Sequence, residues 1–311
     1  MPKRVAESLR LVVALGLLLL VFSVMADHFF TSRTFSSVAN QIPSLLVVAV
    51  GMTYVIVLGG IDLSVGSLLA LCGGVMGVAT AGLHLPLPLA VLMCLAVGAG
   101  VGAVNGMVMV RWRLPAFIVT LGMLEIARGG AYLVTHSQTQ YIGASIESIS
   151  EVAVLGLSLP FFLALALVFA AQWTLDRTVF GRYVVATGTN EEAVRLSGVD
   201  TSKIRVAVYT LCGFLAGLGA IIHTARLGAA DPNAGGGLEL QAIAAVVVGG
   251  TSLMGGRGSV VGTLFGVLII AVLDTGLAQV GAQEPAKRVI TGLVIVGAVI
   301  LDNYRHGRRH G

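Results

Sequence analysis

Long apolar runs separated by short polar breaks are the feature that most constrains the fold of this 311-residue chain. Hydrophobic residues make up 56% of the sequence and charged residues only 11%, whereas about a quarter of a soluble domain is charged. Because a membrane span needs about 20 mostly apolar residues, the runs predict an all-α, polytopic bundle of transmembrane helices. We expect a single transmembrane domain over residues 1–311.

We place about ten spans along the chain. They cover residues 11–26, 40–58, 66–82, 88–110, 115–134, 159–175, 206–225, 240–254, 259–280 and 287–302. The eighth is short and flanked by glycines, which is typical of a broken or re-entrant segment. The first run resembles a signal peptide, but further spans follow it, so we interpret it as an uncleaved helix.

The distribution of basic residues sets the expected orientation. With the N-terminus inside, 14 lysines and arginines lie on the inner side, 4 on the outer side and 1, Arg128, within a span. Cytoplasmic loops are enriched in Lys and Arg, and an even number of spans keeps the arginine-rich C-terminal tail inside. We therefore expect both termini in the cytoplasm. The basic residues form no stripe with interleaved aromatics, so nothing indicates nucleic-acid binding.

The segment Gly59–Ser67 places a carboxylate and two hydroxyls between two apolar runs. Asp at the centre of a membrane helix costs about 2.5–3.5 kcal/mol on insertion scales, and non-helical backbone at membrane depth must be buried in protein or line a wet cavity. Asp62 and Ser64 are thus candidate pathway residues at a helix break, Gly59 and Gly60. The alternative is a tight turn in which Asp62 caps the next helix, and the two interpretations are compatible.

A second Gly-Gly break follows the eighth run. Val247-Val248-Gly249-Gly250 resembles Val57-Leu58-Gly59-Gly60, and each precedes a Gly-Ser pair and another apolar run. Many transporters are built from internal repeats, with the binding site at broken helices. This similarity indicates a weak internal repeat with helix breaks at Gly249 and Gly250.

Four further polar residues lie inside predicted spans. Glu125 and Arg128 are three residues apart, so they share a helix face on which they could pair. Asn105 is suited to a hydrogen bond between helices, and Asp274 lies in the ninth span. Each is a candidate for the translocation pathway, because intramembrane charges usually face the bundle interior or a cavity. A structural ion pair remains the alternative for Glu125 and Arg128.

The longest charged segment, residues 176–205, predicts a short helix at about 190–197. Thr189 or Asn190 is placed to cap its N-terminus, Glu191 and Glu192 lie in its first turn, and Gly198 provides a stop. A loop this long between spans is typically functional. We interpret it as a cytoplasmic lever on which a partner docks, with a solvated loop as the alternative.

Several chemistries are excluded by the residues themselves. The three lysines follow Pro, Ser and Ala, so there is no Gly-x-x-x-x-Gly-Lys-Ser/Thr phosphate loop and no ATP site of that type. The six histidines and three cysteines have no metal-ligand or redox spacing, and no Gly-x-Ser-x-Gly nucleophile elbow is present. We therefore predict no catalytic residues, no metal and no cofactor in this chain.

Ordered blocks of the sequence closely resemble the membrane subunit of bacterial ATP-binding-cassette (ABC) sugar importers, the ribose/xylose/arabinose permease family. The blocks are Gly51-Met52-Thr53 through Gly59-Gly60-Ile61-Asp62-Leu63-Ser64-Val65-Gly66-Ser67, Pro115–Gly122 with Ala127-Arg128-Gly129, Phe180–Tyr183, Gly188–Gly198, Pro232–Gly235, Leu240–Leu253 and Gly255–Ser259. Together they extend over roughly residues 45 to 300, in family order.

The resemblance implies a permease of the bacterial inner membrane that dimerises, as a homo- or heterodimer. It also implies a cytoplasmic ATPase subunit that carries ATP and Mg, a periplasmic solute-binding protein and a sugar-like solute. The coupling helix would then comprise Thr189, Asn190, Glu191, Glu192, Arg195, Leu196 and Gly198. The chain departs from the family pattern at Glu125, where a small or neutral residue is common, and at Asp274, where Asn is common, which favours a polyol or amino sugar as alternative solutes.

A second class of function stays open at this point. An ion-coupled secondary carrier would use Asp62, Glu125 or Asp274 as coupling carboxylates and would need no ATPase. The sequence contains no catalytic constellation that an intramembrane enzyme would need. The coupling segment and dependence on a separate ATPase distinguish the importer from the carrier.

Overall fold

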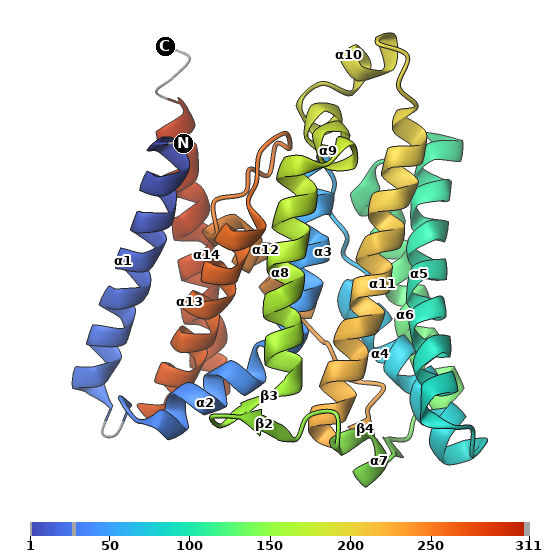
Figure 1. Cartoon of the computed structure of the whole chain (residues 1–311), viewed down its shortest axis with the longest axis vertical. Coiled ribbons are helices and arrows are strands. Elements are labelled where there is room, and N and C mark those ends of the chain that lie inside the picture. Colours follow the sequence, from blue (N-terminus) through green and yellow to red (C-terminus); the bar gives the residue numbers. More distant parts are fainter. Residues whose placement is uncertain (1, 27–28, 308–311) are drawn as a thin grey trace.

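The computed structural model describes residues 2–26 and 29–307 and shows a bundle of long helices (Figure 1). The helices are α1 (Pro2–Met25), α2 (Ser32–Gln41), α3 (Pro43–Val57), α4 (Val65–Gly77) with the π-helical turn η1 (Val78–Gly82), α5 (Leu87–Trp112), α6 (Ala116–Thr135), α7 (Ala144–Glu147), α8 (Leu159–Arg177), α9 (Val179–Thr189), α10 (Glu191–Leu196), α11 (Thr201–Leu227), α12 (Leu238–Val248), α13 (Val260–Gln279) and α14 (Glu284–Gly307). The predicted all-α membrane bundle is confirmed.

Four very short strands lie at the end of the bundle opposite α10 (Figure 1). β1 (Gln140–Tyr141) pairs antiparallel with β4 (Ala229–Ala230), and β2 (Val152–Val154) pairs antiparallel with β3 (Leu157–Ser158). The first pair aligns Gln140 with Ala230. These strands and α7 lie within residues 136–158 and 228–237, two connections between the predicted spans.

Each of the ten predicted spans overlaps one of the long or intermediate helices. Within the described residues, six helices are long and apolar enough to cross a membrane alone, and a seventh span results if α2 and α3, bent by 47°, are counted together. α12 has only 11 residues, so it is about 16 Å long, roughly half the thickness of a bilayer core. This agrees with the prediction of a broken or re-entrant eighth segment.

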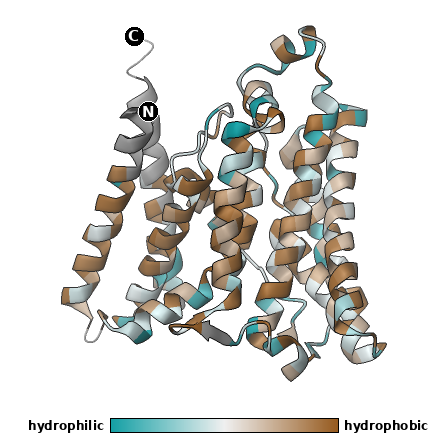
Figure 2. Cartoon of the chain, in the orientation of Figure 1, coloured by the Kyte–Doolittle hydropathy of each residue, from teal (hydrophilic) through white to brown (hydrophobic). Residues whose placement is uncertain are grey.

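Burial divides the bundle into inner and outer helices. α3 is buried at every position except Leu45, as expected for a helix that is hydrophobic all round. α5 and α6 instead expose large apolar side chains such as Leu92 (62%) and Ile126 (67%). Hydrophobic residues dominate the middle of the helices and hydrophilic ones gather toward the two ends (Figure 2), which is the distribution that a lipid environment requires.

The closest helix pair, α5 and α11, is packed through small residues. A β-carbon at Gly102 would overlap the carbonyl oxygen of Tyr209, and one at Gly213 would overlap that of Gly98. Small residues at four-residue spacing allow such close backbone contact in membranes. The glycines of α5 and α11 therefore let the two helices pack backbone against backbone.

This packing predicts different effects for two neighbouring glycines. Gly102→Ala forces the two backbones apart and should lower the free energy of unfolding by about 1–3 kcal/mol. Gly100, on the same helix, has open space at its β-carbon position, so Gly100→Ala should stabilise the helix slightly. Thermal unfolding of the two purified variants in detergent measures the difference. Equal melting temperatures would contradict close α5–α11 packing.

Candidate functional site

Two helix breaks, at the ends of α3 and α12, have the same backbone geometry. α3 ends with Gly59 at φ +88°, and α12 ends with Gly250 at φ +91°. The next amide donates five residues back in both cases, from Gly60 to Val55 (2.9 Å) and from Thr251 to Val246 (3.1 Å). This is a Schellman-type ending. Both predicted breaks are present, and Gly59 corresponds to Gly250, one residue away from the register that the sequence similarity indicated.

The two breaks meet at the end of α3. The segment that follows α12 returns to donate a hydrogen bond from the Gly256 amide to the Val57 carbonyl (2.8 Å). Deeper in the bundle, the hydroxyls of Thr53 on α3 and Thr263 on α13 lie 2.8 Å apart. The helices on either side of the two breaks therefore form one connected unit.

A buried polar cluster lies directly after the first break. One carboxylate oxygen of Asp62 accepts hydrogen bonds from the Ser64 amide (2.9 Å) and the Ser64 hydroxyl (2.6 Å). The Asn105 amide of α5 donates to the same hydroxyl (3.1 Å). Asp62, Ser64 and Asn105 are all fully buried. Ser64, not Asp62, occupies the N-cap position of α4, and no side chain caps that helix, so Asp62 stabilises the turn that leads into α4.

Several atoms of this cluster have no partner among the described residues. They are Oδ2 of Asp62, Oδ1 of Asn105 and the hydroxyl of Tyr209. Tyr209 comes from α11, and its hydroxyl lies against Gly60. Tyr209 could not be selected from the sequence, because only the packing of α11 onto the break brings its hydroxyl to Gly60. The break is thus enclosed by polar groups from α5 and α11 that are not fully paired.

The remaining pathway candidates lie elsewhere in the bundle. Arg128 does not pair with Glu125. Its guanidinium donates to the carbonyls of Pro232 (2.7 Å) and Ala234 (2.9 Å), so the alternative of an ion pair between Glu125 and Arg128 is wrong. Glu125 is exposed on α6, and Asp274 is half-buried on α13. The six candidates therefore do not form one site: three surround the first break, two lie on α6 and one lies on α13.

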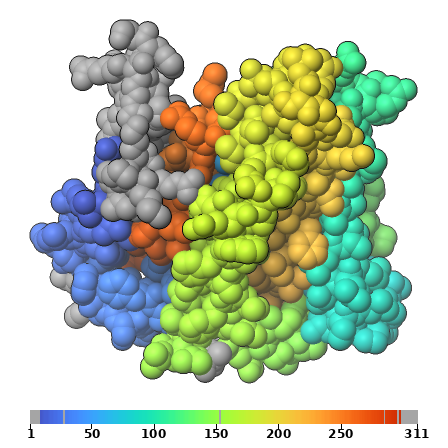
Figure 3. Space-filling model, turned by 45° about the horizontal axis from the view of Figure 1, so that its top comes forward, coloured from blue at the N-terminus to red at the C-terminus, as the bar shows by residue number. Residues whose placement is uncertain are grey.

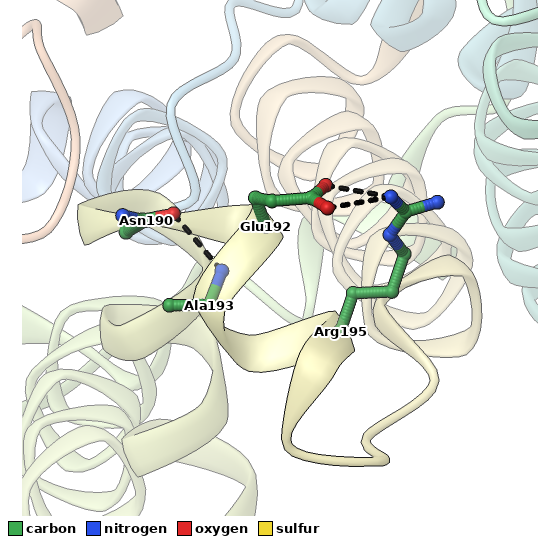
Figure 4. A network of polar contacts seen from close by, with 4 residues as sticks. All are labelled: Asn190, Glu192, Ala193 and Arg195. Atoms are coloured by element: carbon green, nitrogen blue, oxygen red, sulfur yellow. Dashed lines mark hydrogen bonds and ion pairs between the residues drawn. The ribbon is translucent and has the colours of Figure 1, made fainter.

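The predicted helix in the charged segment is present as α10, with Glu191 and Glu192 in its first turn. Asn190 is its N-cap and accepts a hydrogen bond from the Ala193 amide (3.0 Å), whereas Thr189 belongs to α9 and donates to the Val185 carbonyl. Glu192 binds Arg195 through both carboxylate oxygens at 2.7 Å (Figure 4). No residue of α10 is buried, and Leu196 is 78% exposed. The turn ends at Gly198, at φ +84°, as predicted.

α9, which attaches α10 to the bundle, was not predicted from the sequence. Thr178 caps α9 by accepting from the Gly181 amide (3.1 Å). Phe180 stacks on Tyr54 of α3 with ring centroids 6.3 Å apart. At the other end of α9, Gly188 lies against the carbonyl of Val57 and the amide of Gly256. The sequence signal for this helix is Thr178, a residue type that often caps helix N-termini.

α10 is also joined to α11 and borders a cleft. Arg205 of α11 pairs with Glu191 at 2.6 Å. A cleft of about 920 Å³ lies between α10, α11, the α5–α6 connection and the first break, with Arg113, Glu192 and Ile61 in its lining. The α9–α10 segment (yellow) stands out at this end of the molecule (Figure 3), so its surface is free to receive a partner.

Comparison with known proteins places the chain in a transporter class. A family model described as "Branched-chain amino acid transport system / permease component" matches residues 34–299. The chain belongs to this permease family, which confirms the resemblance stated above and makes it a multi-pass membrane protein of a transport system rather than an enzyme.

Curated relatives narrow the class to ABC import permeases. The ribose import permease protein RbsC of Escherichia coli (strain K12) is 42% identical over 94% of this chain and 92% of its own length. The fructose import permease protein FrcC of Rhizobium meliloti is 34% identical over 94% and 85%. The autoinducer 2 import system permease protein LsrC of Enterobacter sp. (strain 638) is 38% identical over 83% and 75%.

The polar cluster predicts opposite effects for two small deletions. Ser64→Ala removes the hydroxyl that bonds both Asp62 and Asn105, and should lower the free energy of unfolding by about 1–3 kcal/mol because it leaves buried polar atoms unpaired. Tyr209→Phe removes a hydroxyl that has no partner, so it should leave stability unchanged or raise it. Thermal unfolding of both variants tests this, and a Tyr209→Phe protein as unstable as Ser64→Ala would contradict the described cluster.

Proposed function

We propose that this chain is the membrane subunit of an ATP-driven importer that moves a sugar or related polyol into the cytoplasm by alternating access. The proposal rests on the exposed helix α10 and its attachment to both helix breaks. Relatives of the chain are named as import permeases for ribose, fructose and autoinducer 2, which supports a small polar solute. The energy would come from a separate ATPase subunit that holds ATP and Mg.

Two physical connections lead from α10 to the breaks. The first runs through α9, where Gly188 lies against Val57 at the end of α3 and Gly256 donates to the same carbonyl. The second runs through the Glu191–Arg205 pair into α11, one turn before Tyr209. Because packed helices transmit displacement as rigid units, closure of docked ATPase subunits would shift the end of α3 and the Gly60–Ser64 segment together.

The orientation follows from the same surface. The start of α1 and the end of α14 lie at the end of the bundle that carries α10 (Figure 1). Arg113, Arg177, Arg195 and Arg205 belong to the connections and helix ends there, which supports a cytoplasmic side by the positive-inside rule. In this proposal both termini are cytoplasmic, the β1–β4 end receives solute from a periplasmic binding protein, and a second permease copy completes the bundle.

An ion-coupled secondary carrier is the competing function. The unpaired carboxylate oxygen of buried Asp62 is the observation that favours it, because intramembrane carboxylates often relay protons or bind ions. However, such a carrier has no use for an exposed helix that is capped, internally paired and connected to both breaks. We therefore assign Asp62 to the closure of the break and α10 to the coupling.

A charge exchange in α10 tests the docking claim. Glu192→Arg combined with Arg195→Glu keeps an ion pair within the helix but reverses the charges that a partner meets. Both side chains are about 60% exposed, so folding should be little affected. We expect loss of ATPase co-purification and of uptake. Lys203→Gln, at an 86% exposed side chain on the same segment, serves as the control, and unchanged co-purification and uptake in the exchanged variant would refute docking at α10.

The second connection has its own test. Arg205→Gln removes the ion pair between α10 and α11 while leaving the exposed surface of α10 intact. We expect the ATPase still to bind but the solute moved per ATP hydrolysed to fall several-fold, because α11 no longer follows α10. Parallel measurement of hydrolysis and uptake in reconstituted complexes gives this ratio. An unchanged ratio would show that α11 does not take part in coupling.

A further inference from the structure

Three polar side chains on α6 and α12 have no partner, although both helices lie in the apolar part of the bundle. Glu125 and Gln241 are exposed and Glu239 is half-buried. None of them makes a side-chain hydrogen bond or ion pair with any residue in the described part of the chain. Carboxylates at such positions are costly in lipid, so they face a bundle interior or a water-filled cavity.

An exposed stretch of non-helical backbone lies beside them. Residues 231–237 connect β4 to α12, and Asn233 and Gly236 of this segment are exposed. The segment is fastened to α6 by Arg128, as described above, and by Tyr132, whose hydroxyl donates to the Asn233 side chain (2.7 Å). Glu125, Arg128 and Tyr132 are spaced by three and four residues, so they share one side of α6.

The position of this segment follows from the lengths of the helices. α12 ends beside α3 at the α10 end of the bundle and is about 16 Å long, so it begins about halfway across a bilayer core. α4 begins at the same level, because the backbones of Gly66 and Gly235 are in contact and the Glu239 carboxylate lies against Gly66. Glu125 is the tenth of the 20 residues in α6, which places it at a similar depth.

Lipid cannot solvate this surface. Non-helical backbone at membrane depth occurs only where it is buried in protein or lines a wet cavity, and in a single copy of the chain Asn233 and Gly236 are open. The surface formed by Glu125, Tyr132, Asn233, Gly236 and Glu239, which we call the midplane face, therefore needs water or a hydrogen-bonding solute against it.

We propose that the midplane face is the solute-contact site of the translocation pathway, and that its ligand is a neutral polyhydroxylated molecule of monosaccharide size. Carboxylates accept hydrogen bonds from solute hydroxyls, the Asn233 amide, which is held by Tyr132 and Asp231, keeps a second N–H to donate, and Tyr132 adds an aromatic ring. The site rests on the proposed function and is one wall of a passage that the second permease copy closes.

Accessibility to water tests the face without requiring transport. Asn233→Cys and Gly236→Cys are introduced singly into the full chain and reacted in membrane vesicles with a membrane-impermeant maleimide. A β-carbon at Gly236 has room. Ile126→Cys, at an exposed apolar position of α6, is the matched control, and the native cysteines are buried. We expect the two positions of the midplane face to react at least about tenfold faster than Ile126→Cys, because the reaction needs a hydrated thiolate. Equally slow reaction at all three positions would overturn the site.

Solute contact is tested with Glu239 in the assembled complex. With saturating binding protein and ATP, D-ribose and D-fructose uptake is compared for Glu239→Gln and Glu239→Leu. The loss of a solute hydrogen bond should slow uptake about tenfold in the leucine variant, while glutamine keeps the bond and should stay within about threefold of the parent. Identical rates in the two variants would show that Glu239 does not contact the solute. A parent complex without ATP-dependent uptake would instead contradict the proposed function, and the maleimide rates would be unaffected by that failure.

Discussion

The hydrogen bond from the Gly256 amide to the Val57 carbonyl is the interaction on which the arrangement of the two helix breaks depends, and with it the coupling that we propose. An unsatisfied backbone group in a bilayer costs several kcal/mol, so a helix that ends inside a membrane bundle needs its last carbonyls paired. α3 meets this requirement with a Schellman-type ending and with an amide supplied by the segment after α12. The segment after α12 thereby satisfies the end of α3, and a hydrogen bond joins the two breaks.

The same position is where the exposed α9–α10 segment attaches. Gly188 reaches the Val57 carbonyl from α9, and Phe180 stacks on Tyr54 one turn earlier on α3. α10 itself buries no residue and is held by its cap, the Glu192–Arg195 pair and the Glu191–Arg205 pair. A helix with this construction contributes little to the stability of the chain, which agrees with a role in contacting another subunit.

Local signals in the sequence were sufficient for the spans, the two glycine breaks and the ends of α10. Glycine, Asn190 and the paired charges act over four or five residues, so their structural consequences can be predicted from spacing. The partner of Arg128, the approach of Tyr209 to Gly60 and the attachment of α9 depend on contacts between residues more than one hundred positions apart, or between separate helices. The sequence similarity aligned Gly59 with Gly249, whereas the backbone φ angles make Gly59 equivalent to Gly250. Residue types alone could not show this, because both residues at each break are glycines.

The surface around Glu239 illustrates the same limit from the functional side. Glu239 carries no distinctive pattern in the sequence, Asn233 was noted only within the Pro232–Gly235 block, and Glu125 was selected as a charge within a span that departs from the family pattern. The structure relates them through the short length of α12 and the close contact of Gly66 with Gly235. Their shared depth, rather than any motif, makes them candidates for contact with a polar solute.

Uptake by reconstituted vesicles tests the central claim most directly. D-ribose, D-fructose and a polyol would be supplied to the permease with the ATPase and the binding protein each present or withheld, and with ATP or an imposed ion gradient as the energy source. The account predicts uptake only when both partners and ATP are present. Uptake by the permease alone in response to an ion gradient would contradict it and would make the intramembrane carboxylates the coupling groups.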